Sequence, residues 1–312
     1  MKTPVIIDTD PGIDDAVAIF LAFSQEKILD VRGITTIAGN VNVDRTTRNA
    51  LDLVGHIGKN AKIAKGAPKP LLRSLKTAEE VHGKTGLGPV VLKESKLKFY
   101  EKKAWDLIHE EAEAWDGELE IIALGPLTNI AITLIKYPDI KKKIKKVTLM
   151  GGACFLGNVT PSAEFNIYVD PEAADIVFQS GIPITMVGLD ATHQALLYEE
   201  DIENLTSRKN VISETLKIIL KENLAFQKKV AGLEAAIMHD AVAVAAVIDP
   251  TIIQKKHYYV AVEKEGFFTY GKTVVDLNKV TKNSPNVEVA LGVDRLRFID
   301  MLKEMMKTYE LL

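Results

Sequence analysis

Carboxylates crowd one short segment near the start of the chain. The segment VIIDTDPGIDDAVAIF contains Asp8, Asp10, Asp14 and Asp15. Like charges this close repel one another, and a helix N-terminus stabilises a single carboxylate by only about 0.3–1 kcal/mol. A bound cation would explain the crowding, because Ca²⁺ takes roughly 6–8 oxygen ligands and Mg²⁺ about six. The segment lacks His and Cys, which disfavours Zn²⁺. A capped helix with exposed acidic residues is the plain alternative.

A second segment, LMGGACFLGNVTPSAEFNIYVDPEAA, carries side chains suited to a sugar. Asn158, Glu164 and Asn166 lie in an irregular stretch after a strand, and their groups can bind neighbouring hydroxyls through paired donors and acceptors. A polar surface loop is the alternative. Asp170 precedes a proline at a helix start and is interpreted as a helix cap. Cys154 has no neighbouring base and is interpreted as a packing residue.

A histidine and an aspartate adjoin at the start of a very apolar helix, as His239 and Asp240. Asp240 could join a cation site while His239 donates a proton. The alternative is a capping aspartate beside a solvent-facing histidine. Asn40, after a strand, and His82, in a long loop, are weaker candidates. No partner is evident in the sequence for the remaining histidines, His56, His109, His193 and His257.

Strand-like and helix-like segments alternate between these residues. Strands are predicted over 5–8, 31–38, 62–64, 119–124, 146–150, 183–187, 257–262, 267–275 and 287–292. Helices are predicted over 14–25, 43–57, 100–115, 127–137, 171–180, most of 199–248 and 294–309. Repeated βα units indicate an α/β fold with a mostly parallel central sheet flanked by helices. No linker or internal repeat divides residues 1–312, so a single domain is predicted, with ligands beyond the carboxyl ends of its strands.

The bulk composition narrows the function classes. The chain has 312 residues and a formal charge of -3, which argues against a nucleic-acid-binding surface. One cysteine allows no disulfide within the chain and suits a reducing compartment. No apolar stretch approaches the roughly 20 residues that span a bilayer. The N-terminus does not resemble a signal peptide. A cytoplasmic protein without membrane contact is therefore expected.

Four motifs in this order resemble those of a known family. DTDPGIDDA, LGPLTNIA, GNVTPSAEFNIYVDPEAA and MHDAVA together are similar to the inosine–uridine-preferring nucleoside hydrolases, and they span most of the chain. The resemblance implies a single domain of the nucleoside hydrolase fold that cleaves the N-glycosidic bond of ribonucleosides, giving ribose and a free base for nucleoside salvage. It also implies a bound Ca²⁺ and assembly as a homodimer or homotetramer.

The resemblance also implies roles for individual residues. Asp10 corresponds to a calcium ligand and to the base that activates a metal-bound water, and His239 corresponds to the acid that helps the nucleobase depart. The other implied calcium ligands are Asp15, Asp240 and the backbone carbonyl of Leu124, where many members have Thr. The implied ribose contacts and pocket-lining residues are Asp14, Asn40, Met150, Asn158, Glu164, Phe165 and Asn166. Candidate base-side residues are His82, Phe226 and Gln227. For Asp8 we expect a hydrogen-bonding role behind the ligands.

Base preference depends on the helix before His239, which offers Phe226 and Gln227 with no following tyrosine. Gln227 could bind a pyrimidine edge, which favours pyrimidine or broad specificity. Two other functions stay open. A Mg²⁺-dependent phosphohydrolase could use Asp8 or Asp10 as nucleophile, but it has no use for the Asn/Glu/Asn loop. A nucleoside- or ribose-binding protein without turnover would not need Asp10, a proton donor and a cation together.

Overall fold

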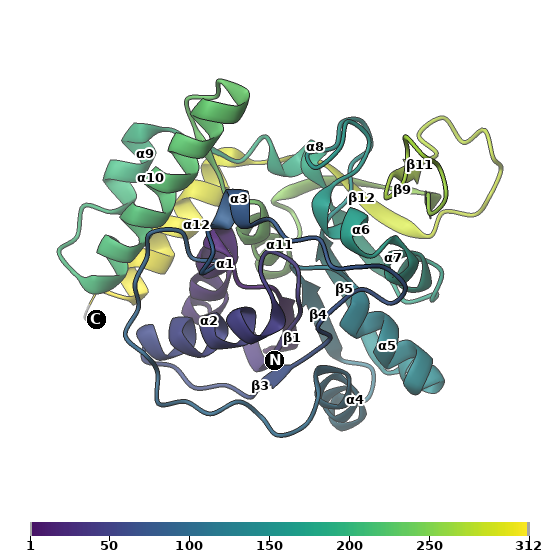
Figure 1. Ribbon diagram of the computed structural model, residues 1–312, viewed down its shortest axis with the longest axis horizontal. Coiled ribbons are helices and arrows are strands. Elements are labelled where there is room, and N and C mark those ends of the chain that lie inside the picture. Colours follow the sequence, from purple (N-terminus) through teal and green to yellow (C-terminus); the bar gives the residue numbers. More distant parts are fainter. Residues whose placement is uncertain (1, 311–312) are drawn as a thin grey trace.

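A central eight-stranded sheet forms the middle layer of the molecule (Figure 1). The computed structural model describes residues 2–310. The strand order is β3-β2-β1-β4-β5-β6-β12-β9, and all neighbours are parallel except the edge strand β9, which is antiparallel to β12. The strands are β1 Thr3–Thr9, β2 Leu29–Thr36, β3 Ile63–Lys65, β4 Leu119–Ala123, β5 Ile144–Met150, β6 Ile184–Val187, β9 Ile253–Tyr258 and β12 Val287–Val293. Two small antiparallel sheets pair β7 Leu196–Leu197 with β8 Ala236–Ile237, and β10 Val260–Val262 with β11 Thr273–Val275.

Helices cover both faces of the sheet, as predicted. One hydrophobic core packs α1, α2, α10, α11 and α12 against the sheet, and a second core packs α4, α5 and α7 against its other face (Figure 1). The helices are α1 Ile13–Ser24, α2 Val43–His56, α3 Glu79–His82, α4 Ala104–Trp115, α5 Thr128–Lys136, α6 Phe165–Val169, α7 Pro171–Phe178, α8 Leu189–Thr192, α9 Glu199–Leu205, α10 Val211–Ala231, α11 His239–Ile248 and α12 Arg295–Thr308, with a 3₁₀ helix over Pro138–Lys142. No helix within residues 2–310 is both long and apolar enough to cross a membrane.

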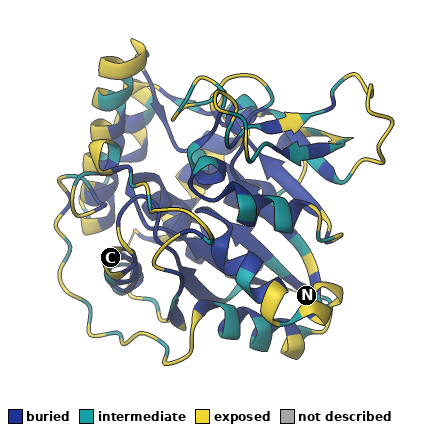
Figure 2. Cartoon of the chain, turned by 45° about the vertical axis from the view of Figure 1, so that its right-hand side comes forward, coloured by how far each residue is buried: buried dark blue, intermediate teal, exposed yellow. Residues whose placement is uncertain are grey.

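The strands at the centre of the sheet are largely buried, whereas exposed residues lie mainly on outer helices and loops (Figure 2). Strand β1 shows why. It reads TPVIIDT, and Val5, Ile6 and Ile7 are all fully buried. Alternating residues of β1 therefore enter the two different cores, as expected for a parallel strand covered on both faces. Because β1 is fixed by both cores, the residues that follow it have a defined position at the carboxyl edge of the sheet.

The C-terminal third departs from the predicted strands. The strand predicted over 257–262 is the junction of two strands in different sheets, β9 and β10. Most of the strand predicted over 267–275 is a turn-rich loop, and only Thr273–Val275 pairs with β10. Gly271 adopts a positive φ of 77° there, which ends regular strand geometry. The apolar composition of this segment reflects exposed aromatic residues, since Phe267 is 91% exposed.

Candidate active site

Four aspartates meet at the carboxyl edge of the sheet. Asp10 follows β1, Asp14 and Asp15 lie in the first turn of α1, and Asp240 lies in the first turn of α11. Helices α1 and α11 pack against each other, so residues more than 220 positions apart become neighbours. Carboxylate oxygens of Asp14, Asp15 and Asp240 lie within 4.8 Å of one another. All four side chains are buried, Asp10 to 1% exposure.

Asn40 holds two of these acids from the neighbouring β2–α2 loop. Its backbone N–H donates to Asp10 Oδ2 over 2.6 Å, and its Nδ2 donates to the Asp10 carbonyl and to Asp15 Oδ2, both over 3.1 Å. Asp15 also accepts from the Thr9 hydroxyl and, over 2.8 Å, from the Gly12 N–H. The resemblance predicts Asn40 beside the ribose. In the structure Asn40 lines the cavity, and its amide is hydrogen-bonded to Asp10 and Asp15.

Two glycines leave room for the carboxylate of Asp10. A Cβ on Gly39 would lie 2.1 Å from Asp10 Oδ2, and a Cβ on Gly125 would lie 2.5 Å from Asp10 Oδ1. Any side chain at either position would therefore displace the carboxylate. Asp10 Oδ1 is buried and has no hydrogen-bond partner among residues 2–310. Unpaired buried carboxylate oxygens are costly, so this atom calls for a ligand outside the described protein atoms.

The electrostatics of the cluster suit a hard cation. Burial, together with the nearby charges of Asp15 and Asp14, raises the pKa of Asp10 well above its usual value. Burial and Asp15 raise the pKa of Asp14 to about 7, and burial and the other three acids raise that of Asp240. Burial also raises the pKa of Asp15. A divalent ion would relieve both the desolvation and the mutual repulsion, and all-oxygen donors are those that Ca²⁺ and Mg²⁺ prefer.

A cavity of about 360 Å³ opens above the acids. This volume falls within the range of ligand pockets. Asp10 and Asp15 are buried beneath it, and every other residue predicted for the site lies on its wall. These lining residues are Asp14, Asn40, His82, Leu124, Met150, Asn158, Glu164, Phe165, Asn166, Phe226, Gln227, His239 and Asp240.

One side of the cavity is built by the loop after β5. Glu164 caps the short helix α6, accepting from the N–H groups of Asn166 over 2.9 Å and Ile167 over 3.2 Å, and also from Gly152 N–H over 2.8 Å. Burial raises the pKa of Glu164 to about 7. Asn166 Nδ2 donates to the carbonyl of Leu124 over 2.8 Å. This carbonyl keeps a second lone pair for another contact.

Histidines and helix α10 form the other end of the cavity. His82 is buried, and its Nδ1 accepts from the Ile13 N–H over 3.1 Å. His239 begins α11, and its Nδ1 lies 2.8 Å from the Thr192 hydroxyl. Desolvation lowers the pKa of His82 to about 4 and, with His193 and His82 nearby, that of His239 to about 3. Phe226 and Gln227 face this end from α10.

Sequence reasoning missed two residues at this end. His193 lines the cavity, with its ring 5.5 Å from that of His239, and Asn223 lines it from α10. His193 was judged to have no partner. It follows the four-residue helix α8, whose length is too short for a periodic pattern, so nothing in the sequence indicated the contact. Asn223 lies at i−4 from Gln227, and this helical spacing was the available signal.

Asp8 lies behind the other acids and does not line the cavity. Its Oδ2 accepts from the Thr35 hydroxyl over 2.5 Å and from Asn129 Nδ2 over 2.8 Å. Asn129 also donates to the Thr36 carbonyl over 3.1 Å, so Asp8 links β1 to β2 and α5. Burial raises the pKa of Asp8 to about 7. These contacts agree with the expected hydrogen-bonding role.

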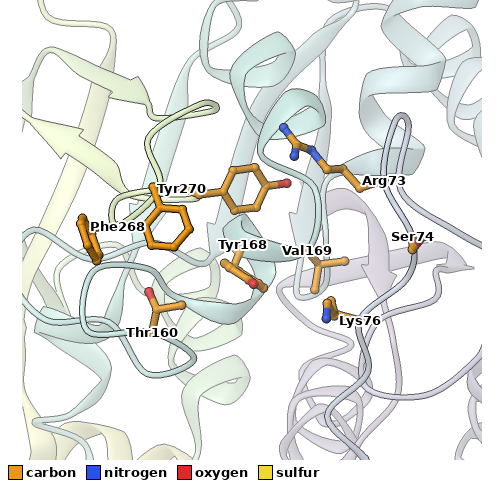
Figure 3. A pocket seen from close by; sticks show the side chains of 9 residues that line it. Arg73, Ser74, Lys76, Thr160, Tyr168, Val169, Phe268 and Tyr270 are labelled. Atoms are coloured by element: carbon orange, nitrogen blue, oxygen red, sulfur yellow. The ribbon is translucent and has the colours of Figure 1, made fainter.

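A second cavity of about 380 Å³ is lined by residues from 73–76, 160, 168–169 and 267–270 (Figure 3). Tyr168, Tyr270 and Phe268 surround it, and the guanidinium of Arg73 lies 4.4 Å from the Tyr270 ring centre while pairing with Glu172. Its described lining contains no acidic residue. The buried acids, together with Asn158, Glu164 and Asn166 of the segment after β5, belong to the first cavity, which is therefore the candidate active site.

Comparison with known proteins agrees with this geometry. The family model for inosine-uridine preferring nucleoside hydrolases matches residues 5–300. The chain is 42% identical over 311 residues to the pyrimidine-specific ribonucleoside hydrolase RihA of Citrobacter koseri, covering 99% of both chains. It is 40% identical to the RihA of Escherichia coli O1:K1, covering 99% of this chain and all of that one.

Solved structures give the same result. A plant nucleoside hydrolase, PpNRh1, superposes with a TM-score of 0.92 at 36% identity, covering 98% of this chain and 99% of that one. A purine-preferring ribonucleoside hydrolase from Gardnerella vaginalis superposes with a TM-score of 0.93 at 32% identity, covering 99% and 100%. The likeness thus extends over the whole fold.

Proposed function

The chain belongs to the inosine-uridine preferring nucleoside hydrolase family and is a ribonucleoside hydrolase, and we propose that it is calcium dependent, with Asp10 as its general base. The observation that carries this proposal is the unpaired, buried Oδ1 of Asp10 within a cluster of four acids at the floor of the cavity. An N-glycosyl hydrolase needs a base that takes a proton from the attacking water, and negative charge near the sugar that stabilises the transition state.

Asp10, Asp15, Asp240 and the carbonyl of Leu124 would hold the calcium ion. The proposal is supported by the raised carboxylate pKa values and by the absence of any cationic side chain from the described lining of the cavity. When bound, the ion would supply positive charge that acidifies water and attracts the sugar hydroxyls. Asn40 would keep Asp10 and Asp15 in place for it.

Asp10 would then accept a proton from the attacking water. The bond between C1′ and the base breaks with positive charge on the ribose, as in other glycosidic cleavages. Asp14 and Glu164 would bind ribose hydroxyls together with Asn158 and Asn166, and their charge would stabilise that transition state. This role is supported by their common position on the cavity wall.

The leaving base would be bound at the histidine end of the cavity. His239 would provide it with a proton or a strong hydrogen bond, and His82 would lie on the same side. We propose a pyrimidine preference. It is supported by Gln227 beside Phe226 on α10, and by relatives at 40–42% identity that are named pyrimidine-specific.

Initial rates of reducing-sugar release test the proposal. The purified enzyme should release ribose from uridine and cytidine faster than from inosine and adenosine, and EGTA should abolish the activity until Ca²⁺ is restored. Unchanged turnover after exhaustive chelation would contradict calcium dependence. Phosphate release from a phosphomonoester would instead favour the phosphohydrolase, and binding without any turnover would favour a nucleoside-binding protein.

The expected assembly as a homodimer or homotetramer and the cytoplasmic location are further parts of the proposal. Their support is the family relationship and, for the location, the single cysteine. Light scattering coupled to size-exclusion chromatography would test the assembly, since a mass near 34.3 kDa would contradict it.

A further inference from the structure

The ring of His239 is held at one nitrogen and open at the other. Nδ1 lies 2.8 Å from Thr192 Oγ1. No hydrogen-bond partner for Nε2 occurs among residues 2–310, and the half-buried ring lines the cavity. The geometry therefore assigns the two nitrogens different tasks: Nδ1 is fixed by the protein, and Nε2 is available to a ligand.

Within residues 2–310, the Thr192 hydroxyl makes no hydrogen bond other than the one to His239. Thr192 is the last residue of α8 and is fully buried. Its backbone N–H donates to the Gly188 carbonyl over 3.1 Å. Its Oγ1 has one hydrogen-bond partner among the described residues, Nδ1 of His239. A buried hydroxyl normally finds a partner, and here that partner is the imidazole on the cavity wall.

Helix α8 is also tied to the sugar side of the cavity. Leu189 N–H donates to the Gly152 carbonyl over 2.9 Å, and Asp190 accepts from Cys154 N–H over 2.6 Å. A Cβ on Gly188 would lie only 2.6 Å from the Gly152 carbonyl oxygen, so the two segments pack closely. The same short helix therefore fixes Thr192 relative to the loop that carries Glu164 and Asn166.

We propose that Thr192 is a positioning residue that holds Nδ1 of His239, so that a protonated Nε2 faces the departing base. This inference rests on the proposed function. It adds a residue that acts only through His239 and does not itself touch the substrate.

The chemistry follows from the dual nature of a hydroxyl. A hydroxyl can donate to a bare Nδ1 or accept from Nδ1–H. Because Thr192 Oγ1 has no other acceptor among residues 2–310, donation to Nδ1 is the arrangement that satisfies its buried proton, and it leaves the single ring proton on Nε2. During the reaction the C1′–N bond breaks with its electron pair on the base, and the water oxygen bonds to C1′. Asp10 takes one water proton, Nε2–H donates a hydrogen bond to the departing base and stays on the ring, and the base takes its proton from solvent.

Without the hydroxyl, the neutral ring loses this control. Its proton can then move to Nδ1, and Nε2 would present a lone pair to an electron-rich leaving group. The second-nitrogen bond of a histidine generally sets which nitrogen is protonated. The fall in turnover on removing the Thr192 hydroxyl should therefore be larger for leaving groups that need a hydrogen-bond donor than for those that do not.

Thr192→Val removes the hydroxyl at nearly constant volume, and Thr192→Ser keeps it. With uridine, kcat of Thr192→Val should fall by roughly tenfold, which is less than the about 10²–10⁴-fold that an acid–base group itself contributes, because Thr192 acts only through His239. KM should change little, and Thr192→Ser should retain most of the rate. Thr206→Val is the matched control, since its buried hydroxyl bonds only to the Ile202 carbonyl over 2.7 Å in α9.

Two readouts separate positioning from a merely structural role. In a His239→Gln background, Thr192→Val should have no further effect. With 4-nitrophenyl β-D-ribofuranoside, whose leaving group departs as a stable anion, Thr192→Val should retain near-parent turnover. Equal losses on both substrates, or additive losses in the double variant, would overturn the inference.

Nitrogen-15 NMR of histidine-labelled, calcium-loaded enzyme gives a test independent of turnover. The parent should show a protonated Nε2 for His239, assigned by its absence from His239→Gln, and Thr192→Val should shift the signals toward the other tautomer. An unchanged spectrum would contradict the inference. Failure of the parent to cleave uridine would instead contradict the proposed function, so the two outcomes are distinguishable.

Discussion

At the scale of single residues, Asp10 lies within the cluster of four acids and has one buried carboxylate oxygen without a protein partner among residues 2–310. Asp8 Oδ1 is also unpaired, but Asp8 lies behind the cluster and does not line the cavity. The other carboxylate oxygen and the carbonyl of Asp10 are both bonded to Asn40. The neighbouring Asp15 has three donors, so it is held more completely by the protein. Asp10 is thus the acid whose chemistry is left for a ligand or a water.

Asp10→Asn should abolish most turnover and leave the fold intact. The amide cannot accept the proton of water, so kcat on uridine should fall by about 10²–10⁴-fold. Removal of one buried charge should leave the thermal midpoint in EGTA equal to or above that of the parent, because burial opposes ionisation of Asp10. Calorimetry and steady-state rates check both, with the exposed Asp44→Asn as control. Near-parent hydrolysis would exclude Asp10 as the base.

Asn40→Ala should weaken calcium binding more than substrate binding. The change removes the amide bonds to the Asp10 carbonyl and to Asp15 but keeps the backbone N–H to Asp10. Residues that orient metal ligands typically contribute about 10–100-fold in affinity. Calorimetric titration of Ca²⁺ into chelator-treated protein checks this, with exposed Asn204→Ala as control. A raised KM with unchanged calcium affinity would return Asn40 to a ribose contact.

At the scale of elements, the site depends on loops at strand ends that approach one another closely. Asp10 follows β1, Gly39 follows β2 and Gly125 follows β4, and these three strands are adjacent in the sheet. The parallel register therefore brings one carboxylate between two glycines. No local propensity of the residues would produce that contact without the sheet.

Gly39→Ala should reduce catalysis far more than stability. Its Cβ would overlap Asp10 Oδ2, and the carboxylate is the more movable of the two groups. Displacement of a catalytic group by about 1 Å can cost roughly 10²-fold in rate. Rates and thermal unfolding measured together check this. Gly292→Ala serves as control because the nearest atoms to a Cβ there belong to the side chains of Gln194 and Gln254, at 3.3–3.4 Å. A parent-like rate for Gly39→Ala would show that the loop can move instead.

The sequence predicted the long helices and most strands of the central sheet, but it missed the one-turn helices and was wrong over most of 267–275. Val5–Asp8 was correctly predicted as a strand because its run of β-branched and apolar residues is flanked by a Pro-Gly turn. Helices α3, α6 and α8 each have four or five residues, which is about one turn and too short for a period. The position of Thr192 beside His239 was therefore invisible, since it arises from the packing of α8. The acids, the sugar loop and His239 were predictable because each lies next to a strand end or a helix start.

At the scale of the whole molecule, the acid cluster is predicted to couple stability to pH and, through the proposed ion, to calcium. Asp8 and Asp14 have pKa values raised to about 7 by burial, and those of Asp10 and Asp240 are also raised. These acids therefore bind more protons in the folded than in the unfolded state between about pH 4 and 7, so their contribution to the free energy of unfolding falls as pH rises through this window. The lowered pKa values of His82 and His239 act in the opposite direction. A cation binds the ionised form of the acids and reverses their loss of stability.

Calorimetry in EGTA should therefore show a thermal midpoint that decreases from about pH 5 to pH 8. The increase in midpoint on adding saturating Ca²⁺ should grow over the same range, because proton and calcium compete for the same carboxylates. A thermal midpoint in EGTA that rises with pH over the whole range would contradict the raised pKa values of the buried acids in the ion-free protein. If the increase in midpoint on adding Ca²⁺ did not depend on pH, the ion would bind outside this cluster of acids.

The composition of the cavity wall has an evolutionary consequence. The floor and the sugar side come from the sheet edge and its packed loops, whereas the histidine end includes residues 78–82 around α3 and residues 223–231 of α10, two segments outside the central sheet. If the nucleobase binds at the histidine end as proposed, substitutions in these two segments can change base preference without altering the acids or the loop after β5. Related hydrolases can therefore differ in the nucleobase that they prefer. The relatives of this chain include one named purine-preferring and one named pyrimidine-specific.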